Sequence, residues 1–313
     1  MPLFPRLRVA PIDGMLLLMT LIWGTNYSIV KHAFGEIDPQ AFNAARMLLA
    51  SSVFLAIIVA VRAPAVRARL PEALAGVLHT PAPVTVRDWL GLAALGVFGH
   101  GLYQFLFIGG LALTSVATSS LMLAATPVVI ALMSAAIGED RVGPLHWAGA
   151  GLSVAGIYGV VGHAAPGQGS SLAGEAMMLG AVCCWALYTI GARRLMVRHS
   201  PLGVTGVSMA IGSALYLTVM LPHITSVRWT ALGAGTWAAI VYSGLFALGV
   251  AYTIWYAAVR QIGSARTSVY SNVVPLVAMA TAVVFLHEPL TLLKIAGAAA
   301  VIAGVALTRA GGR

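Results

Sequence analysis

Long apolar runs separated by short polar stretches recur along the whole chain. They predict membrane-spanning helices, because each run is close to the ~20 residues that cross the hydrocarbon of a bilayer. The predicted spans cover residues 14–33, 41–61, 89–112, 116–137, 145–163, 172–192, 203–222, 235–258, 267–286 and 290–308. The predicted fold class is an all-α polytopic membrane protein with ten transmembrane helices.

The second five spans read as a diverged copy of the first five. Leu-Ser-Val-Ala-Gly-Ile at 152–157 is matched by Ala-Val-Ile-Ala-Gly-Val at 300–305, an offset of 148 residues. Trp23 and Trp185 occupy matching places in the first helix of each half, at an offset of 162. The two offsets differ because only the first half has the longer loop at 62–88.

This repetition predicts two five-helix units, residues 12–163 and 173–310. Since each unit has an odd number of spans, the second must be inserted upside down relative to the first. Two inverted repeats around a central cavity are a common construction of secondary transporters.

Composition and charge agree with a membrane protein. Apolar residues make up 59% of the chain and charged residues 9%, whereas about a quarter of a soluble domain is charged. The net charge of +9 is unevenly placed: fourteen basic residues fall at the predicted cytoplasmic ends and loops. Lys31, Arg228 and Lys294 fall on the other side, and Arg46 lies within a span. This positive-inside bias predicts cytoplasmic termini, so the basic charge indicates no nucleic-acid partner.

Several segments together resemble the EamA family of the drug/metabolite transporter superfamily. They are Gly174-Glu175 with 181–189 (Ala-Val-Cys-Cys-Trp-Ala-Leu-Tyr-Thr), 45–50, 115–160, 264–290 with its His-Glu-Pro-Leu ending, and 295–305. Within that family the chain is most similar to the bacterial exporters of aromatic and other neutral amino acids, the YddG type. The resemblance implies a transporter of the bacterial inner membrane. The chain departs from the family pattern at 138–144, and at Ser208, where a second arginine is expected.

Polar and aromatic residues gather on one face of six predicted spans, the same three from each half. In the first span Trp23, Asn26 and Tyr27 are spaced i, i+3, i+4, which places them on one helix face. The candidate substrate-binding residues are Trp23, Asn26, Tyr27, His100, Tyr103, Gln104, Ser119, Met122, Trp185, Tyr188, Tyr252, Trp255, Ser268, Ser271 and Asn272. Because polar groups in hydrocarbon are expensive, this pattern predicts an inner ring of six helices around a cavity. Packing or an interfacial aromatic belt is the alternative for the rings and hydroxyls.

The cavity chemistry indicates the substrate class. Rings with amides and hydroxyls suit an amphipathic solute, and ring faces attract an ammonium group. Arg46, the one arginine within a span, lies nearer the outer end of that span. We expect it to form a structural ion pair with Glu175 at the outer start of the sixth span, which leaves the cavity walls without a fixed charge. A phosphate ester would then lack a cation clamp. Neutral amino acids fit best, and other small metabolites or cationic drugs are the alternative.

Two further features bear on mechanism. Pro127 and Pro275 occupy equivalent sites, and each leaves a backbone carbonyl without its helical hydrogen bond. They are therefore candidate hinges; the alternative is that they only kink their helices. None of the nine acidic residues lies mid-span, which favours facilitated diffusion by alternating access over proton coupling. His100 is the best candidate for pH sensitivity. An enzyme or channel is disfavoured, no cofactor or metal is expected, and a monomer in contact with lipid could suffice.

Overall fold

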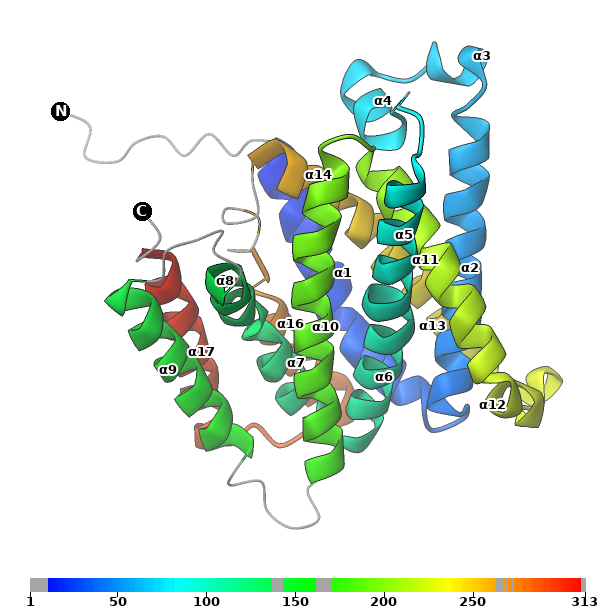
Figure 1. Cartoon of the computed structure of the whole chain (residues 1–313). Coiled ribbons are helices and arrows are strands. Elements are labelled where there is room, and N and C mark those ends of the chain that lie inside the picture. The colour runs from blue at the N-terminus through cyan, green and yellow to red at the C-terminus, as the bar shows by residue number, and fades with distance from the viewer. Residues whose placement is uncertain are drawn as a thin grey trace.

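The computed structural model describes residues 11–80, 82–136, 143–161, 171–262 and 273–310, together with 267, 270 and 271. These parts of the chain form helices and short connections, with no β-strand among them. Most helices run between the two ends of one bundle (Figure 1). The predicted all-α class is confirmed for the described residues.

The described residues of the first half form nine helices and one π-helical segment. They are α1 (Pro11–Ala33), α2 (Pro39–Ala60), α3 (Pro64–Arg67), α4 (Glu72–Leu78), α5 (Val86–Leu95), η1 (Gly96–Leu102), α6 (Tyr103–Leu113), α7 (Val116–Ala124), α8 (Thr126–Ala136) and α9 (Pro144–Val161). The short helices α3 and α4 lie in the long loop that only this half has.

The second half follows the same order. Its elements in the described residues are α10 (Leu172–Met196), α11 (Pro201–Val219), α12 (Leu221–Ser226), η2 (Trp229–Ala231), α13 (Ala234–Tyr242), η3 (Ser243–Val250), α14 (Ala251–Ile262), α16 (Val274–Leu286) and α17 (Leu292–Ala310). Five helical stretches are long and apolar enough to cross a membrane: 39–60, 86–113, 172–196, 201–219 and 234–262. Shorter apolar helices cover 116–130, 274–286 and 292–304. The protein is therefore a multi-pass membrane protein.

The second helix of each half begins with the same local chemistry. Pro39 and Pro201 each stand at the first helical position, where a missing N–H costs nothing. The preceding residue caps the free backbone donors: Asp38 accepts from Gln40 N and Ala41 N, and Ser200 accepts from Gly203 N. These caps fix where α2 and α11 start.

The third span of each half is interrupted by a π-helical segment. η1 covers Gly96–Leu102 and η3 covers Ser243–Val250, which are matching positions at the offset of 148. A π-helical turn changes the angle between residues before and after it, and such turns are frequent at functional sites. Here they alter which side chains of the two spans face the centre of the bundle.

The last spans of the two halves pack on each other at one edge of the bundle, where α9 and α17 lie side by side (Figure 1). Small residues permit this close approach. A β-carbon added at Gly156 would meet Ala300 Cβ at 2.8 Å and Gly297 O at 2.9 Å. The matching Gly304 lies equally tightly against Ser153 and the carbonyl of Gly149.

Candidate functional site

The central helices enclose a cavity of about 90 Å³, room for a few water molecules. Its walls are mostly apolar and aromatic. They are formed by Trp23, Asn26, Tyr27, Arg46, Tyr103, Gln104, Phe107, Ser120, Leu123, Ala124, Thr126, Pro127, Ile130, Trp185, Ala247, Leu248, Tyr252, Trp255, Ser271, Val274 and Pro275.

The walls come from the predicted spans, with one addition. The first half supplies α1, α6, α7 and α8, and the second supplies α10, η3, α14, Ser271 and α16. These are the same three spans of each half. The addition is Arg46, which reaches the cavity from α2.

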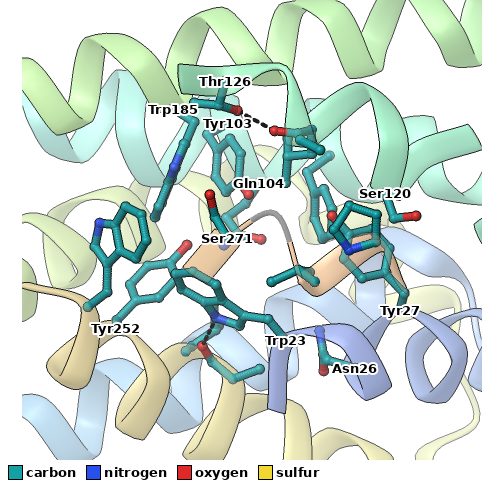
Figure 2. A pocket seen from close by; sticks show the side chains of 18 of the residues that line it. Trp23, Asn26, Tyr27, Tyr103, Gln104, Ser120, Thr126, Trp185, Tyr252 and Ser271 are labelled. Carbon is teal, nitrogen blue, oxygen red and sulfur yellow. Dashed lines mark hydrogen bonds between the residues drawn. The ribbon is translucent and has the colours of Figure 1, made fainter. Parts of the chain in front are cut away.

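A cluster of indole and phenol rings forms one wall (Figure 2). The Trp23 ring lies 6.1 Å from Trp185, 5.8 Å from Tyr252 and 5.5 Å from Trp255, measured between ring centroids. Trp23 Nε1 donates a hydrogen bond to Ala247 O in the π-helical η3 at 3.0 Å. Edge-to-face and tilted contacts of this kind give a wall of defined shape.

A second set of rings extends this wall along α1 and α6. Tyr103 stacks on Phe107 at 5.7 Å, and Phe107 meets the ring of Tyr27 edge-on at 5.5 Å. Tyr103 also contacts Trp185 at 5.2 Å, which joins the two sets. The space between them suits a flat apolar group.

Arg46 provides the charge of the site. Its side chain is buried, 1% exposed, and its guanidinium donates three hydrogen bonds of 2.7 Å: Nε to Asn43 Oδ1, Nη1 to Ser243 Oγ and Nη2 to Gln104 Oε1. Each acceptor is an uncharged oxygen. α2, α6 and η3 thus hold the guanidinium between them.

This arrangement corrects two expectations from the sequence. The structure does not bring Arg46 to Glu175: within the described parts of the chain Arg46 forms no ion pair, and Glu175 stands in the first turn of α10. The face of α2 that carries Arg46 turns toward α6 and η3, whose side chains satisfy it without a carboxylate. Consequently the cavity walls do carry a fixed charge.

Two polar atoms of the cavity wall have no hydrogen-bond partner among the described residues. They are Asn26 Oδ1, an acceptor, and Trp255 Nε1, a donor. Asn26 is only 5% exposed and lies beside Trp23 at the cavity in Figure 2. Buried polar atoms are almost always paired in folded proteins, so unpaired ones at a cavity indicate places where a ligand or water binds.

Both predicted hinge prolines line the cavity. The predicted fourth span breaks next to Pro127, because α7 ends at Ala124 and α8 begins at Thr126. The carbonyl of Leu123, which Pro127 cannot bond, accepts from Thr126 Oγ1 at 2.6 Å. Pro275 lies in the first turn of α16. Their action as hinges stays a prediction.

Some predicted site residues lie elsewhere. His100 and Tyr188 are fully buried behind the cavity wall, with their rings 4.8 Å apart. Ser119 bonds the hydroxyl of Thr114, and Met122 belongs to the apolar core. Ser268 and Asn272 fall outside the described residues.

Other residues of the site are not among those that the sequence predicts. Ser120, Thr126 and Leu248 line the cavity, but no periodic polar pattern marks them. Asn43 had a usable signal, since it precedes Arg46 by three residues on the same helix face. Ser243 had none, because only the tertiary fold brings η3 to α2.

One end of the bundle is fastened by capping bonds between spans. Lys31 Nζ, near the end of α1, donates to the carbonyls of Leu111, Ala112 and Thr114 at 2.8, 2.9 and 2.8 Å. Glu288 accepts from the free backbone N–H groups at the start of α7, from Val116 N at 2.8 Å. Cation at a helix C-terminus and anion at an N-terminus are the favourable placements.

Comparison with known proteins places this sequence among transporters. The pattern of the EamA-like transporter family matches residues 11–162 and again 172–310. "Probable amino-acid metabolite efflux pump" of Salmonella typhimurium is 27% identical, and the match covers 94% of this chain and 93% of that protein. "Probable terminal-alkyne amino-acid exporter" of Streptantibioticus cattleyicolor is 26% identical, with 93% and 91% covered. "Uncharacterized transporter YyaM" of Bacillus subtilis is also 26% identical, with 95% and 92% covered.

A solved crystal structure shares the fold, with a TM-score of 0.65 over 95% of both chains at 22% identity. The family and these relatives are transporters rather than enzymes. The family pattern matches twice, and the two matches together cover nearly the whole chain. This chain therefore belongs to the EamA-like transporter family.

Proposed function

We propose that the protein exports neutral amino acids, including aromatic ones, across the bacterial inner membrane by alternating access. The observation that carries this proposal is the central cavity, whose walls combine large rings with amides and one arginine. Rings accept an apolar or aromatic side chain, and amides and a guanidinium accept the polar end of the same molecule. A cavity of about 90 Å³ must widen to admit an indole-sized group, which agrees with a cavity that opens and closes.

Contacts between equivalent residues support the inverted-repeat architecture that the proposal needs. The matched Trp23 and Trp185 touch ring to ring. Ser51 and Ser213, separated by 162 residues, share a hydrogen bond of 2.6 Å between α2 and α11. Ser153 and Val301, separated by 148 residues, meet across α9 and α17. A residue touches its own counterpart only near the axis that relates two copies.

The names of two relatives and the charges of the cavity walls bear on the direction and energy source of transport. Two relatives carry names of amino-acid export, at 26–27% identity. No acidic residue lines the cavity in the described residues, so a proton-carrying carboxylate is not at hand. We therefore propose uncoupled export, with both termini cytoplasmic because of the positive-inside bias.

The test is exchange in liposomes that contain the purified full-length protein. Vesicles loaded with unlabelled phenylalanine should accumulate labelled phenylalanine transiently, and leucine and tryptophan should compete. An imposed pH gradient should leave the rate nearly unchanged. No exchange of any neutral amino acid would overturn the substrate assignment, and strong accumulation driven by the pH gradient would overturn the uncoupled mechanism.

Export of cationic drugs is the second candidate, because an aromatic wall also binds cations. Arg46 at that wall works against it, since a like charge in a low-dielectric cavity repels a cation. In the same vesicles a quaternary ammonium compound should compete less well than phenylalanine.

A further inference from the structure

We propose that Arg46 binds the carboxylate of the transported solute and that Asn26 Oδ1 accepts a hydrogen bond from its ammonium group. The inference rests on the proposed function and deepens it: the solute is a zwitterion read at both charges. It assigns Arg46 a ligand-binding role in place of the structural ion pair expected from the sequence.

Arg46 has no balancing negative charge among the described residues. Burying a guanidinium is costly unless an opposite charge accompanies it. Yet its three partners, Asn43, Gln104 and Ser243, are all neutral, and no carboxylate of the described residues forms an ion pair with it. A carboxylate arriving with the solute supplies the missing charge.

Arg46 also retains hydrogen-bond donors that its protein partners do not use. Arginine carries five N–H donors, and the protein engages Nε, Nη1 and Nη2 through one bond each. One donor therefore remains on each terminal nitrogen, and these two nitrogens together can hold a carboxylate. Asn43, Gln104 and Ser243 act as positioning residues, because they fix the plane of the guanidinium before the solute arrives.

Asn26 supports the proposal independently of Arg46. Asn26 Oδ1 is a buried acceptor at the same cavity and has no partner among the described residues. An ammonium group offers three donors and no acceptor, so it complements this oxygen. The ring of Trp23 lies beside Asn26 (Figure 2), and the rings of Trp185 and Tyr252 line the same cavity. Their faces add attraction for a cation.

This distribution separates the zwitterion from related molecules. An amine without the carboxylate meets an uncompensated arginine, and an acid without the amine leaves Asn26 unpaired. A phosphate monoester at neutral pH brings more negative charge than the single arginine balances, and no second cationic side chain lines the cavity among the described residues. The order of affinity should be amino acid first, then the acid, then the amine.

The experiment measures competition against phenylalanine exchange in liposomes with the full-length protein. The competitors are unlabelled phenylalanine, 3-phenylpropionate, phenethylamine and phenyl phosphate. In the unaltered protein phenethylamine should compete about 10- to 100-fold less well than phenylalanine, the loss expected for a charge-assisted contact. Phenethylamine competing as well as phenylalanine, or phenyl phosphate competing better, would overturn the proposal without any variant.

Two variants locate the contacts. Arg46→Gln should raise the half-saturating phenylalanine concentration about 10- to 100-fold and remove the preference for phenylalanine over phenethylamine. Asn26→Leu should reduce the preference for phenylalanine over 3-phenylpropionate and leave the carboxylate preference intact. Arg46→Lys keeps the charge and loses the two-bonded contact with a carboxylate. Its half-saturating phenylalanine concentration should lie between those of the unaltered protein and Arg46→Gln, and it serves as the folding control.

The outcomes distinguish this proposal from the proposed function. If phenylalanine exchange is robust but Arg46→Gln keeps the order of competitors, the zwitterion site is wrong and amino-acid transport stands. If no amino acid exchanges, the proposed function fails first. A fall in rate with an unchanged order of competitors would assign Arg46 a structural role.

Discussion

The two halves place different chemistry at equivalent positions of their second helices. Arg46 on α2 reaches the cavity and is held by Asn43, Gln104 and Ser243. Its counterpart Ser208 on α11 is fully buried, bonds Val204 O at 2.7 Å and does not reach the cavity. The framework is therefore repeated while the charge is not. A repeated framework can exchange conformations, and a one-sided charge can orient a solute within it.

The largest effect is expected from moving the charge across this pair. In the double variant Arg46→Ser with Ser208→Arg, the new arginine is buried against Tyr188, whose OH lies 3.4 Å from Ser208 Oγ. We expect a loss of about 3–5 kcal/mol in the free energy of unfolding, the cost of an uncompensated buried charge. Exchange should stay as low as in Arg46→Ser alone. Thermal unfolding and liposome exchange measure the two effects; recovered exchange would mean that the two positions are interchangeable.

The origin of this asymmetry shows what the sequence could reveal. Helical spacing in the sequence predicts several aromatic and amide residues that do line the cavity: Trp23, Tyr103, Gln104, Trp185 and Tyr252. That spacing is a local property, and span length and repetition are local too. The contacts of Arg46 are not, since they depend on how α2 turns against α6 and η3.

His100 shows the limit of a regular period. In an α-helix His100 would share a face with Tyr103 and Gln104, as their spacing in the sequence predicts. The structure puts His100 inside the π-helical η1 and the other two after it. The wider turn changes the angle between them, so His100 packs against Tyr188 while Tyr103 and Gln104 face the cavity.

The C-terminal ends of α1 and α10, the first helices of the two halves, also differ in the contacts of a basic residue. Lys31 on α1 donates to three carbonyls near the end of α6, whereas its counterpart Arg193 on α10 is exposed and makes no hydrogen bond with the described residues. Lys31→Met should lower the free energy of unfolding by about 2 kcal/mol, because it strips a charged donor from helix-end carbonyls. Arg193→Met should change it by less than about 0.5 kcal/mol.

Thermal unfolding of the purified protein compares these two variants directly. Lys31→Arg is the control, since it keeps a cation at the end of α6. Equal losses of unfolding free energy for Lys31→Met and Arg193→Met would contradict a stabilising role for the hydrogen bonds that only Lys31 makes.

The paired tryptophans at the centre offer a smaller contrast. Trp23 Nε1 bonds Ala247 O at 3.0 Å, while Trp185 contributes mainly its ring surface. Trp23→Phe should cost about 1 kcal/mol for the lost hydrogen bond, beyond the ring area that both substitutions remove. Unfolding measurements on Trp23→Phe and Trp185→Phe should therefore rank them in that order; the reverse order would mean that the bond to η3 is not stabilising.

The smallest difference concerns a contact that each half makes, between the turn after its first helix and the third span of the other half. Glu36 accepts from Gly233 N at 2.7 Å and from the Thr236 hydroxyl. At the equivalent positions, Arg198 pairs with Asp88 at 3.3 Å. The same contact is thus made twice, with the acid on the turn in one case and on the helix in the other.

Only in the first of these two contacts does the turn carry the titratable carboxylate, Glu36. The pH dependence of the unfolding temperature therefore distinguishes the two contacts. The hydrogen bonds from Thr236 and Gly233 lower the pKa of Glu36 below its ordinary value. A lowered folded-state pKa gives stability that is fully present above the unfolded pKa and is lost as pH falls toward the folded one. Between pH 7 and pH 4 the unfolding temperature of the unaltered protein should therefore fall more than that of Glu36→Gln. Arg198→Gln should keep nearly the full fall, because arginine does not titrate there and the pKa of its partner Asp88 is lowered chiefly by hydrogen bonds from Thr85. Equal falls in all three would show that the Glu36 contact does not stabilise the folded state.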